Sequence, residues 1–297
     1  MPHPTLTAQP FSADTPDYTP MIRRLKRRRG LVTALLILVT LIPLFLIGPT
    51  EIVLLGRELS FKGLSVGGVI AIICGGWLTG LILGAVVLLP VGNALVMEAD
   101  PAKHLALQEG LFTFTATPVQ KESVRCVSYL LMGRYAESGQ SADILIRGGK
   151  TASLAAGLFC KGRAAFFAGD RETLTAVAAE YEMLAPRLKG TGYDKKRAML
   201  ALMDGILRGD GEAVSRLAPT VTSWEATRLP EAQVDYCRAR AALLLMEQSE
   251  GEERKTYRYE AIHRLLSCKE KGGRSVLTSL AEEALASLPA ETQDQGE

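Results

Sequence analysis

Residues 31–50 read LVTALLILVTLIPLFLIGPT and contain no charged side chain. A helix over 31–48 would be about 27 Å long, which is close to the roughly 30 Å hydrocarbon core of a bilayer. A second stretch, 66–91, reads VGGVIAIICGGWLTGLILGAVVLLPV and is also uncharged. Because a core helix of a soluble protein is seldom apolar on all sides over such a length, we expect two transmembrane helices joined by a short external loop.

A cluster of basic residues immediately precedes the first stretch and indicates the orientation of the chain. It comprises Arg23, Arg24, Lys26, Arg27, Arg28 and Arg29. Residues 1–30 carry a net charge of +4, whereas 31–91 are neutral and the rest carries −2. Since positive charge stays on the cytoplasmic side, we expect a multi-pass protein of the plasma or inner membrane with both termini cytoplasmic. The same cluster can also bind anionic lipid head groups.

Three glycines, Gly76, Gly80 and Gly84, lie at steps of four within the second apolar stretch. They share one face of a helix, and a face of small residues lets another helix approach closely. The partner helix is either the first apolar stretch or a second copy of the chain, although glycine is also common in membrane helices without such a role. Neither stretch contains Asp, Glu, Lys, Arg or His, which usually mark a proton or ion pathway.

The remaining chain has helical periodicity in nearly every segment. Apolar residues follow the three-then-four spacing of a helix over 199–207, 213–221 and 276–288. Asp100-Pro101 is a helix-start signal. Further helices are expected over 121–137, 152–168, 171–185, 231–247 and 254–268. The short breaks between these segments predict that consecutive helices are antiparallel neighbours.

These observations predict an all-α fold, with a transmembrane helical hairpin followed by a cytoplasmic helical-repeat domain. The expected parts are a disordered tail with the basic cluster over 1–30, the two spans within 31–91, the repeat domain over 98–290, and a disordered tail over 291–297.

Two Gly-Asp pairs recur 40 residues apart between expected helices. Gly169 and Gly209 can end a helix in the left-handed conformation, and Asp170 and Asp210 can cap the helix that follows. Such a spacing is typical of a helical-repeat array. An unrelated helical bundle is the alternative.

The stretch from Gly162 through Gly169-Asp170 to Pro186 resembles a tetratricopeptide unit. It has a small residue in the first helix, a turn seven residues later and a proline that closes the second helix. Leu174 and Ala178 stand where the family has its alanine and aromatic landmarks. The resemblance implies a solenoid whose concave face binds a peptide or protein partner, and an adaptor rather than an enzyme.

No established catalytic, cofactor-binding or metal-binding motif occurs in the sequence. The cysteines are far apart and lack the close spacing of zinc ligands, so we interpret them as buried apolar side chains without disulfides. They are Cys74, Cys126, Cys160, Cys237 and Cys268. His104 and His263 have no recognisable nucleophile beside them. We therefore expect a protein that is not an enzyme and needs no cofactor or metal.

The body has mixed charge and lacks the basic stripe of a nucleic-acid-binding protein. Its densest basic run, Lys195-Lys196-Arg197, is interpreted as a solvated helix start capped by Asp194, with contact to an acidic partner or to the membrane surface as alternatives. The sequence thus predicts a membrane-anchored scaffold or adaptor that binds a protein or peptide partner. The alternative is an accessory or assembly subunit of a larger membrane complex that docks through the glycine face. Self-association through the transmembrane helices is a further option.

Overall fold

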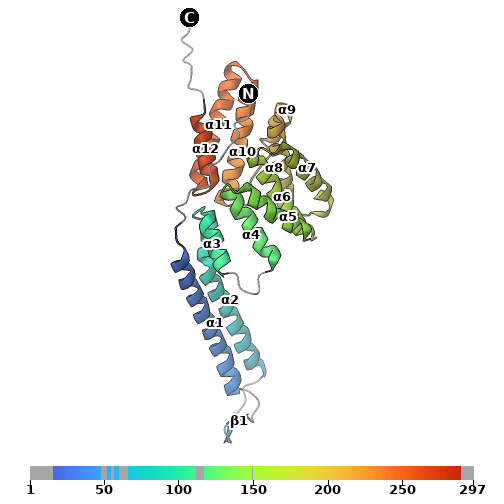
Figure 1. The fold of residues 1–297 in the computed structure, drawn as a ribbon. Coiled ribbons are helices and arrows are strands. Elements are labelled where there is room, and N and C mark those ends of the chain that lie inside the picture. The colour runs from blue at the N-terminus through green and yellow to red at the C-terminus, as the bar shows by residue number, and fades with distance from the viewer. Residues whose placement is uncertain are drawn as a thin grey trace. The chain divides into compact units, whose positions relative to one another are not determined.

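The computed structural model describes residues 16–47, 52–54, 57–59, 66–111, 117–148 and 150–288 (Figure 1). Its internal contacts divide the chain into two units, Asp17–Gly92 and a helical body that begins at Asn93. The prediction of an α-helical protein is confirmed, and the described elements other than helices are two strands of three residues each.

The first unit contains helix α1 (Thr19–Ile47), strands β1 (Ile52–Leu54) and β2 (Arg57–Leu59), and most of helix α2 (Val66–Val96). The two strands form an antiparallel pair in which Ile52 lies opposite Leu59. The β-branched residues Ile52 and Val53 favour a strand. The loop expected between the two apolar stretches therefore contains a small hairpin that the sequence analysis did not predict.

Among the described residues, one segment is long and apolar enough to cross a membrane, namely Cys74–Val96 in α2. A span is thus supported for the second apolar stretch and not for 31–48. The uncharged part of α1, Leu31–Ile47, is shorter than the roughly 20 residues that commonly cross a bilayer, and Gly48 lies outside the described residues. The two-pass arrangement and the cytoplasmic position of both termini stay predictions.

The basic cluster is helical, so residues 19–30 of the tail that we expected to be disordered form part of a helix. Arg23, Arg24, Lys26, Arg27, Arg28 and Arg29 all lie within α1 and are exposed. Lysine and arginine are good helix formers, so the helix extends well ahead of the apolar stretch. At its start, the Thr19 amide donates to the Asp17 carboxylate at 2.9 Å. Residues 1–15 and the predicted tail over 291–297 lie outside the described residues.

Gly80 packs against α1. A Cβ built on Gly80 would lie 2.7 Å from Leu36 Cδ2, which is too close for an unstrained contact. Gly76 is buried, whereas a Cβ on Gly84 would meet nothing within 4 Å. The helix that faces the predicted glycine surface at Gly80 is therefore the first helix of the same chain, and the surface at Gly84 is open.

The described part of the body consists of helices that follow one another in hairpins (Figure 1). They are α3 (Pro101–Leu111), α4 (Pro118–Leu131), α5 (Tyr135–Arg147), α6 (Thr151–Ala168), α7 (Arg171–Leu184), α8 (Thr191–Arg208), α9 (Gly211–Leu217), α10 (Arg228–Gln248), α11 (Gly251–Gly272) and α12 (Val276–Ala286). Consecutive helices pack against each other from α3 to α9 and from α10 to α12. Helix α10 also packs against α8 and α9 and so joins the two groups.

Most helices predicted in the body are found close to their expected ends, but the helix expected over 121–137 is wrong. That range contains the end of α4, a turn at Met132–Gly133 and the start of α5. Gly133 has φ 76°, a left-handed conformation that ends the helix. The helix start at Asp100-Pro101 is confirmed, since the Lys103 amide donates to Asp100 Oδ1 at 2.8 Å.

The two Gly-Asp turns are confirmed. Gly169 and Gly209 have φ 73° and 71°, in the left-handed region that favours glycine. Asp170 accepts a hydrogen bond from the Thr173 amide at 3.0 Å. Asp210 accepts the corresponding bond from the Ala213 amide, also at 3.0 Å. The turn chemistry is therefore repeated, while membership of the tetratricopeptide family stays a prediction.

Hydrogen bonds connect the C-terminal helices to the segment that follows α2. The Arg228 guanidinium donates to the Met97 carbonyl at 2.9 Å and to the Glu270 carbonyl at 2.7 Å. The Arg274 amide donates to the Ala99 carbonyl at 3.0 Å. These bonds hold the beginning of the body against its last hairpin.

The main hydrophobic core runs through the body from Ala99 to Ala281, and a smaller cluster of Cys126, Ala142, Leu145 and Cys160 lies between α4, α5 and α6. Phe167 in α6 joins its parts, because its ring lies 5.8 Å from Tyr135 in α5 and 5.7 Å from Tyr236 in α10. Aromatic rings at these separations contribute beyond their buried area. Helices α5, α6 and α10 therefore meet in the main core.

Close packing at Gly162 in α6 can be tested by substitution. A Cβ there would lie 2.5 Å from Leu200 Cδ2 and 3.2 Å from Val177 Cγ1, and both neighbours are buried. We expect Gly162→Val to lower the free energy of unfolding by about 1–3 kcal/mol, as overpacking does. Chemical denaturation of the purified full-length protein in detergent would measure the change.

Gly139 in α5 provides the control, because a Cβ there would meet nothing within 4 Å. We expect Gly139→Ala to raise the free energy of unfolding by about 0.5–1 kcal/mol, since alanine favours a helix over glycine. Equal effects at the two positions would contradict the packing at Gly162.

Candidate functional site

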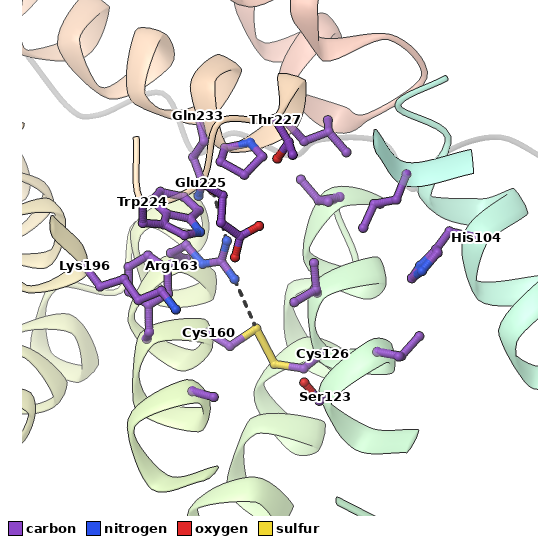
Figure 2. A pocket seen from close by; sticks show the side chains of 18 of the residues that line it. His104, Ser123, Cys126, Cys160, Arg163, Lys196, Trp224, Glu225, Thr227 and Gln233 are labelled. Atoms are coloured by element: carbon purple, nitrogen blue, oxygen red, sulfur yellow. Dashed lines mark hydrogen bonds between the residues drawn. A yellow bond between two sulfur atoms is a disulfide. The ribbon is translucent and has the colours of Figure 1, made fainter. Parts of the chain in front are cut away.

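A cavity of about 350 Å³ lies within the body, with walls from the end of α2, helices α3, α4, α5, α6, α8 and α10, and the loop before α10 (Figure 2). Most of its lining is apolar, including Leu95, Val96, Val124, Val127, Leu229 and Pro230. The charged groups that line it are Arg163, Lys196 and Glu225. Small-molecule sites commonly have this composition, with volumes of roughly 300–1,000 Å³.

Arg163 in α6 is the most buried charged group of the cavity, with 5% of the residue exposed. Its Nη1 donates to Gln233 Oε1 at 3.0 Å, and its Nη2 lies 3.7 Å from Cys160 Sγ. Two donors, Arg163 Nε and Gln233 Nε2, are buried without a hydrogen-bond partner. Such groups cost free energy unless a ligand or water satisfies them.

Aromatic side chains hold the guanidinium in place. Arg163 Cζ lies 4.5 Å from the centre of the Phe159 ring and 5.4 Å from that of Trp224. The two rings meet edge to face, with centroids 4.9 Å apart. Lys196 Nζ lies 5.5 Å from the Phe159 ring. Two cations therefore share one aromatic wall, an arrangement that stabilises positive charge.

Burial shifts the pKa of both cations downwards. It lowers the pKa of Arg163 to about 10, which leaves the guanidinium charged at neutral pH. The pKa of Lys196 is lowered first by burial and then by the neighbouring charge of Arg163. The negative charge of Glu225 opposes both shifts.

Glu225 is exposed and lies on the loop between α9 and α10. Its carboxylate is directed towards the Arg163 guanidinium (Figure 2). The loop is held from two sides, because Lys195 Nζ donates to the Ser223 carbonyl at 2.9 Å and Arg238 Nε donates to the Ala218 carbonyl at 3.0 Å. Trp224 and Glu225 are thus positioned by contacts with α8 and α10.

A disulfide between Cys126 in α4 and Cys160 in α6 borders the cavity. The sequence interpretation of these two residues as separate thiols is therefore wrong. The α4–α5 hairpin brings α4 back against α6, so the Cα atoms lie 6.6 Å apart despite a separation of 34 residues. Cys237 and Cys268 are buried free thiols, as interpreted, and burial raises the pKa of Cys268 to about 12. Cys74 is exposed, which the interpretation missed.

The basic run also differs from its interpretation. Helix α8 starts at Thr191, so Asp194 lies in its first turn and is not the cap. Lys196 is half-buried at the cavity rather than solvated. Arg197 stays near the surface, 3.5 Å from the Glu182 carboxylate.

The two histidines have different surroundings. His104 in α3 is buried, lines the cavity, and its Nδ1 lies 3.3 Å from Ser128 Oγ. Burial lowers the pKa of His104 to about 4, so the ring is neutral at physiological pH. His263 is exposed on α11.

The other residues predicted from sequence do not meet at this cavity. The glycine face at Gly76, Gly80 and Gly84 belongs to the first unit, as does the basic cluster. The Gly169-Asp170 and Gly209-Asp210 turns do not line the cavity. The sequence analysis did not identify Arg163 as a candidate site residue. A single arginine in a helix rich in Ala, Gly and Phe could have indicated it.

In the described ranges, no group of three or more His, Cys, Asp or Glu side chains is placed to hold a metal ion. Comparisons with protein-family models, with curated proteins and with solved structures found no match. Function is therefore inferred from the chain's own residues.

The neutral state of His104 predicts acid sensitivity. Between pH 6.5 and about 4 the unfolded chain binds a proton at this residue that the folded chain does not. The free energy of unfolding should therefore fall as the pH is lowered through this window, by up to about 3 kcal/mol. Denaturation of the full-length protein at a series of pH values would measure the slope. We expect His104→Gln to reduce the slope, and an unchanged slope in this variant would contradict the assignment.

Proposed function

We propose that the chain is a membrane-anchored adaptor whose helical body binds a protein partner. Cys74–Val96 has the length and composition for one crossing. We further propose that residues 31–48 form a second crossing, which makes a two-pass hairpin with both termini in the cytoplasm. The contact between Gly80 and Leu36 supports the pairing of the two helices, and the exposed basic cluster favours this orientation.

The observation that carries the adaptor function is an exposed apolar stripe on α11. One face of α11 is buried through Ala261, Leu265, Cys268 and Gly272. A second face carries the exposed Tyr259 and Leu266 and, between them, the half-buried Ile262, at helical spacing. Tyr259 is 66% exposed and Leu266 is 54% exposed. We call these three residues the α11 stripe.

The α11 stripe has the spacing that an amphipathic partner helix requires. Anchor residues at positions i, i+3 and i+7 are the usual pattern where two helices meet through apolar faces. The flanking residues of α11 are mostly charged, and Arg264 pairs with Glu260 at 2.7 Å. An apolar stripe bordered by polar residues is typical of a protein-binding surface. We therefore infer that the partner is a protein with an apolar helix.

The second candidate is an accessory subunit that docks through its transmembrane helix. It is favoured by the open space at Gly84, where a Cβ would meet nothing within 4 Å. Another membrane helix can approach closely at such a position. A second copy of this chain would satisfy the same surface.

The adaptor proposal can be tested by site-specific crosslinking of the full-length chain in its own membranes. A photoreactive phenylalanine derivative at Ile262 should yield an adduct with one discrete protein. Leu266→Asp should abolish the adduct, because a carboxylate placed in an apolar contact is costly to desolvate. Met183→Asp is the matched control, since Met183 in α7 is also exposed, at 72%, and lies outside the stripe. An adduct that survives Leu266→Asp would contradict the proposal.

Replacing Gly84 separates the two candidates. Gly84→Leu should fill the open surface and leave the Ile262 adduct unchanged if the body binds the partner. If the adduct persists but Gly84→Leu lowers the mass of the complex extracted in mild detergent, a second membrane helix occupies that surface. Loss of the adduct in Gly84→Leu would favour the accessory subunit over the adaptor.

A further inference from the structure

The cavity at Arg163 has an unusual combination of charge and apolar lining. We propose that it binds a single-chain anionic amphiphile, with a carboxylate or phosphate head at Arg163 and Lys196 and an apolar chain against Leu95 and Val96. The cavity is separate from the α11 stripe, so this inference does not depend on the adaptor function.

The head group is indicated by two unpartnered donors. Arg163 is 5% exposed and Gln233 is 1% exposed, yet Arg163 Nε and Gln233 Nε2 have no hydrogen-bond partner. Both side chains line the cavity (Figure 2). An anion in the cavity would accept from these donors, and hydrogen bonds between charged groups are stronger than neutral ones. A neutral hydrocarbon would leave them unsatisfied.

The charge balance of the cavity favours an anion. Arg163 and Lys196 supply two positive charges, and the exposed Glu225 supplies one negative charge. His104 is neutral at physiological pH, because burial lowers its pKa to about 4. The Cys160 sulfur beside Arg163 is part of a disulfide and carries no charge. One positive charge is therefore uncompensated, and Glu225 competes with the ligand for it.

The apolar part of the lining indicates the apolar chain and its source. Leu95 and Val96 are the last residues of the segment that can cross a membrane, and both line the cavity. Val124, Val127 and Leu131 continue the apolar wall along α4. A small hydrophilic anion would leave this wall in contact with water, whereas an acyl chain would cover it. An amphiphile drawn from the bilayer thus fits the lining better than free phosphate.

Tryptophan fluorescence offers a direct measurement, because the chain has two tryptophans and one of them, Trp224, lines the cavity. In the full-length Trp77→Phe protein in nanodiscs, Trp224 becomes the sole reporter. Dodecanoate and dodecyl phosphate should change its emission saturably. Dodecanol should not, and inorganic phosphate should bind far more weakly than dodecyl phosphate.

Three substitutions in the same background assign the head-group site. Arg163→Gln should weaken binding by about tenfold or more, since it removes a charged donor. Glu225→Gln should tighten binding, because it removes the competing carboxylate. Glu225 is exposed, so this gain of affinity cannot come from a folding defect. Lys189→Gln removes an exposed positive charge outside the cavity and should have no effect.

Each contrary result would overturn the inference. Equal binding of dodecanol and dodecanoate would show that the cavity recognises only the apolar chain. Equal binding of inorganic phosphate and dodecyl phosphate would assign a free anion instead of an amphiphile. Equal effects of Arg163→Gln and Lys189→Gln, or weaker binding in Glu225→Gln, would place the head group elsewhere.

Discussion

Arg228 holds together parts of the chain that are far apart in sequence. Its guanidinium bonds the carbonyl of Met97 just after α2 and that of Glu270 near the end of α11. The cavity depends on this bridge, because one wall comes from Leu95 and Val96 and another from the loop that runs into Arg228. Arg228 is exposed, so hydrogen bonds at the surface of the body help to position the buried Arg163 and Gln233.

The elements that sequence reasoning predicted correctly are those set by local chemistry. Glycine in the left-handed region followed by a capping Asp explains the turns at Gly169 and Gly209, and neither depends on distant residues. The wrong prediction of one helix over 121–137 came from relying on apolar periodicity. Met132-Gly133 interrupts a stretch whose apolar spacing is continuous, so periodicity alone joined α4 to α5.

The cavity could not be predicted in the same way. Arg163 and Gln233 are 70 residues apart and meet only because α10 packs across the earlier helices. Lys196 was visible as part of a basic run, but its burial depends on Phe159 and on the loop that carries Trp224. The sequence shows that Arg163 is a single arginine in an apolar helix. Only the structure shows that its Nε donor has no hydrogen-bond partner.

Whether Cys126 and Cys160 form a disulfide in the cell depends on how many times the chain crosses the membrane. Two crossings would keep the body on the side of the basic cluster, where cellular reductants hold cysteines as thiols. A single crossing would deliver it to the opposite, oxidising compartment, where the bond persists. The proposed two-pass arrangement therefore requires that Cys126 and Cys160 be thiols in living cells, and a disulfide between them there would indicate a single crossing.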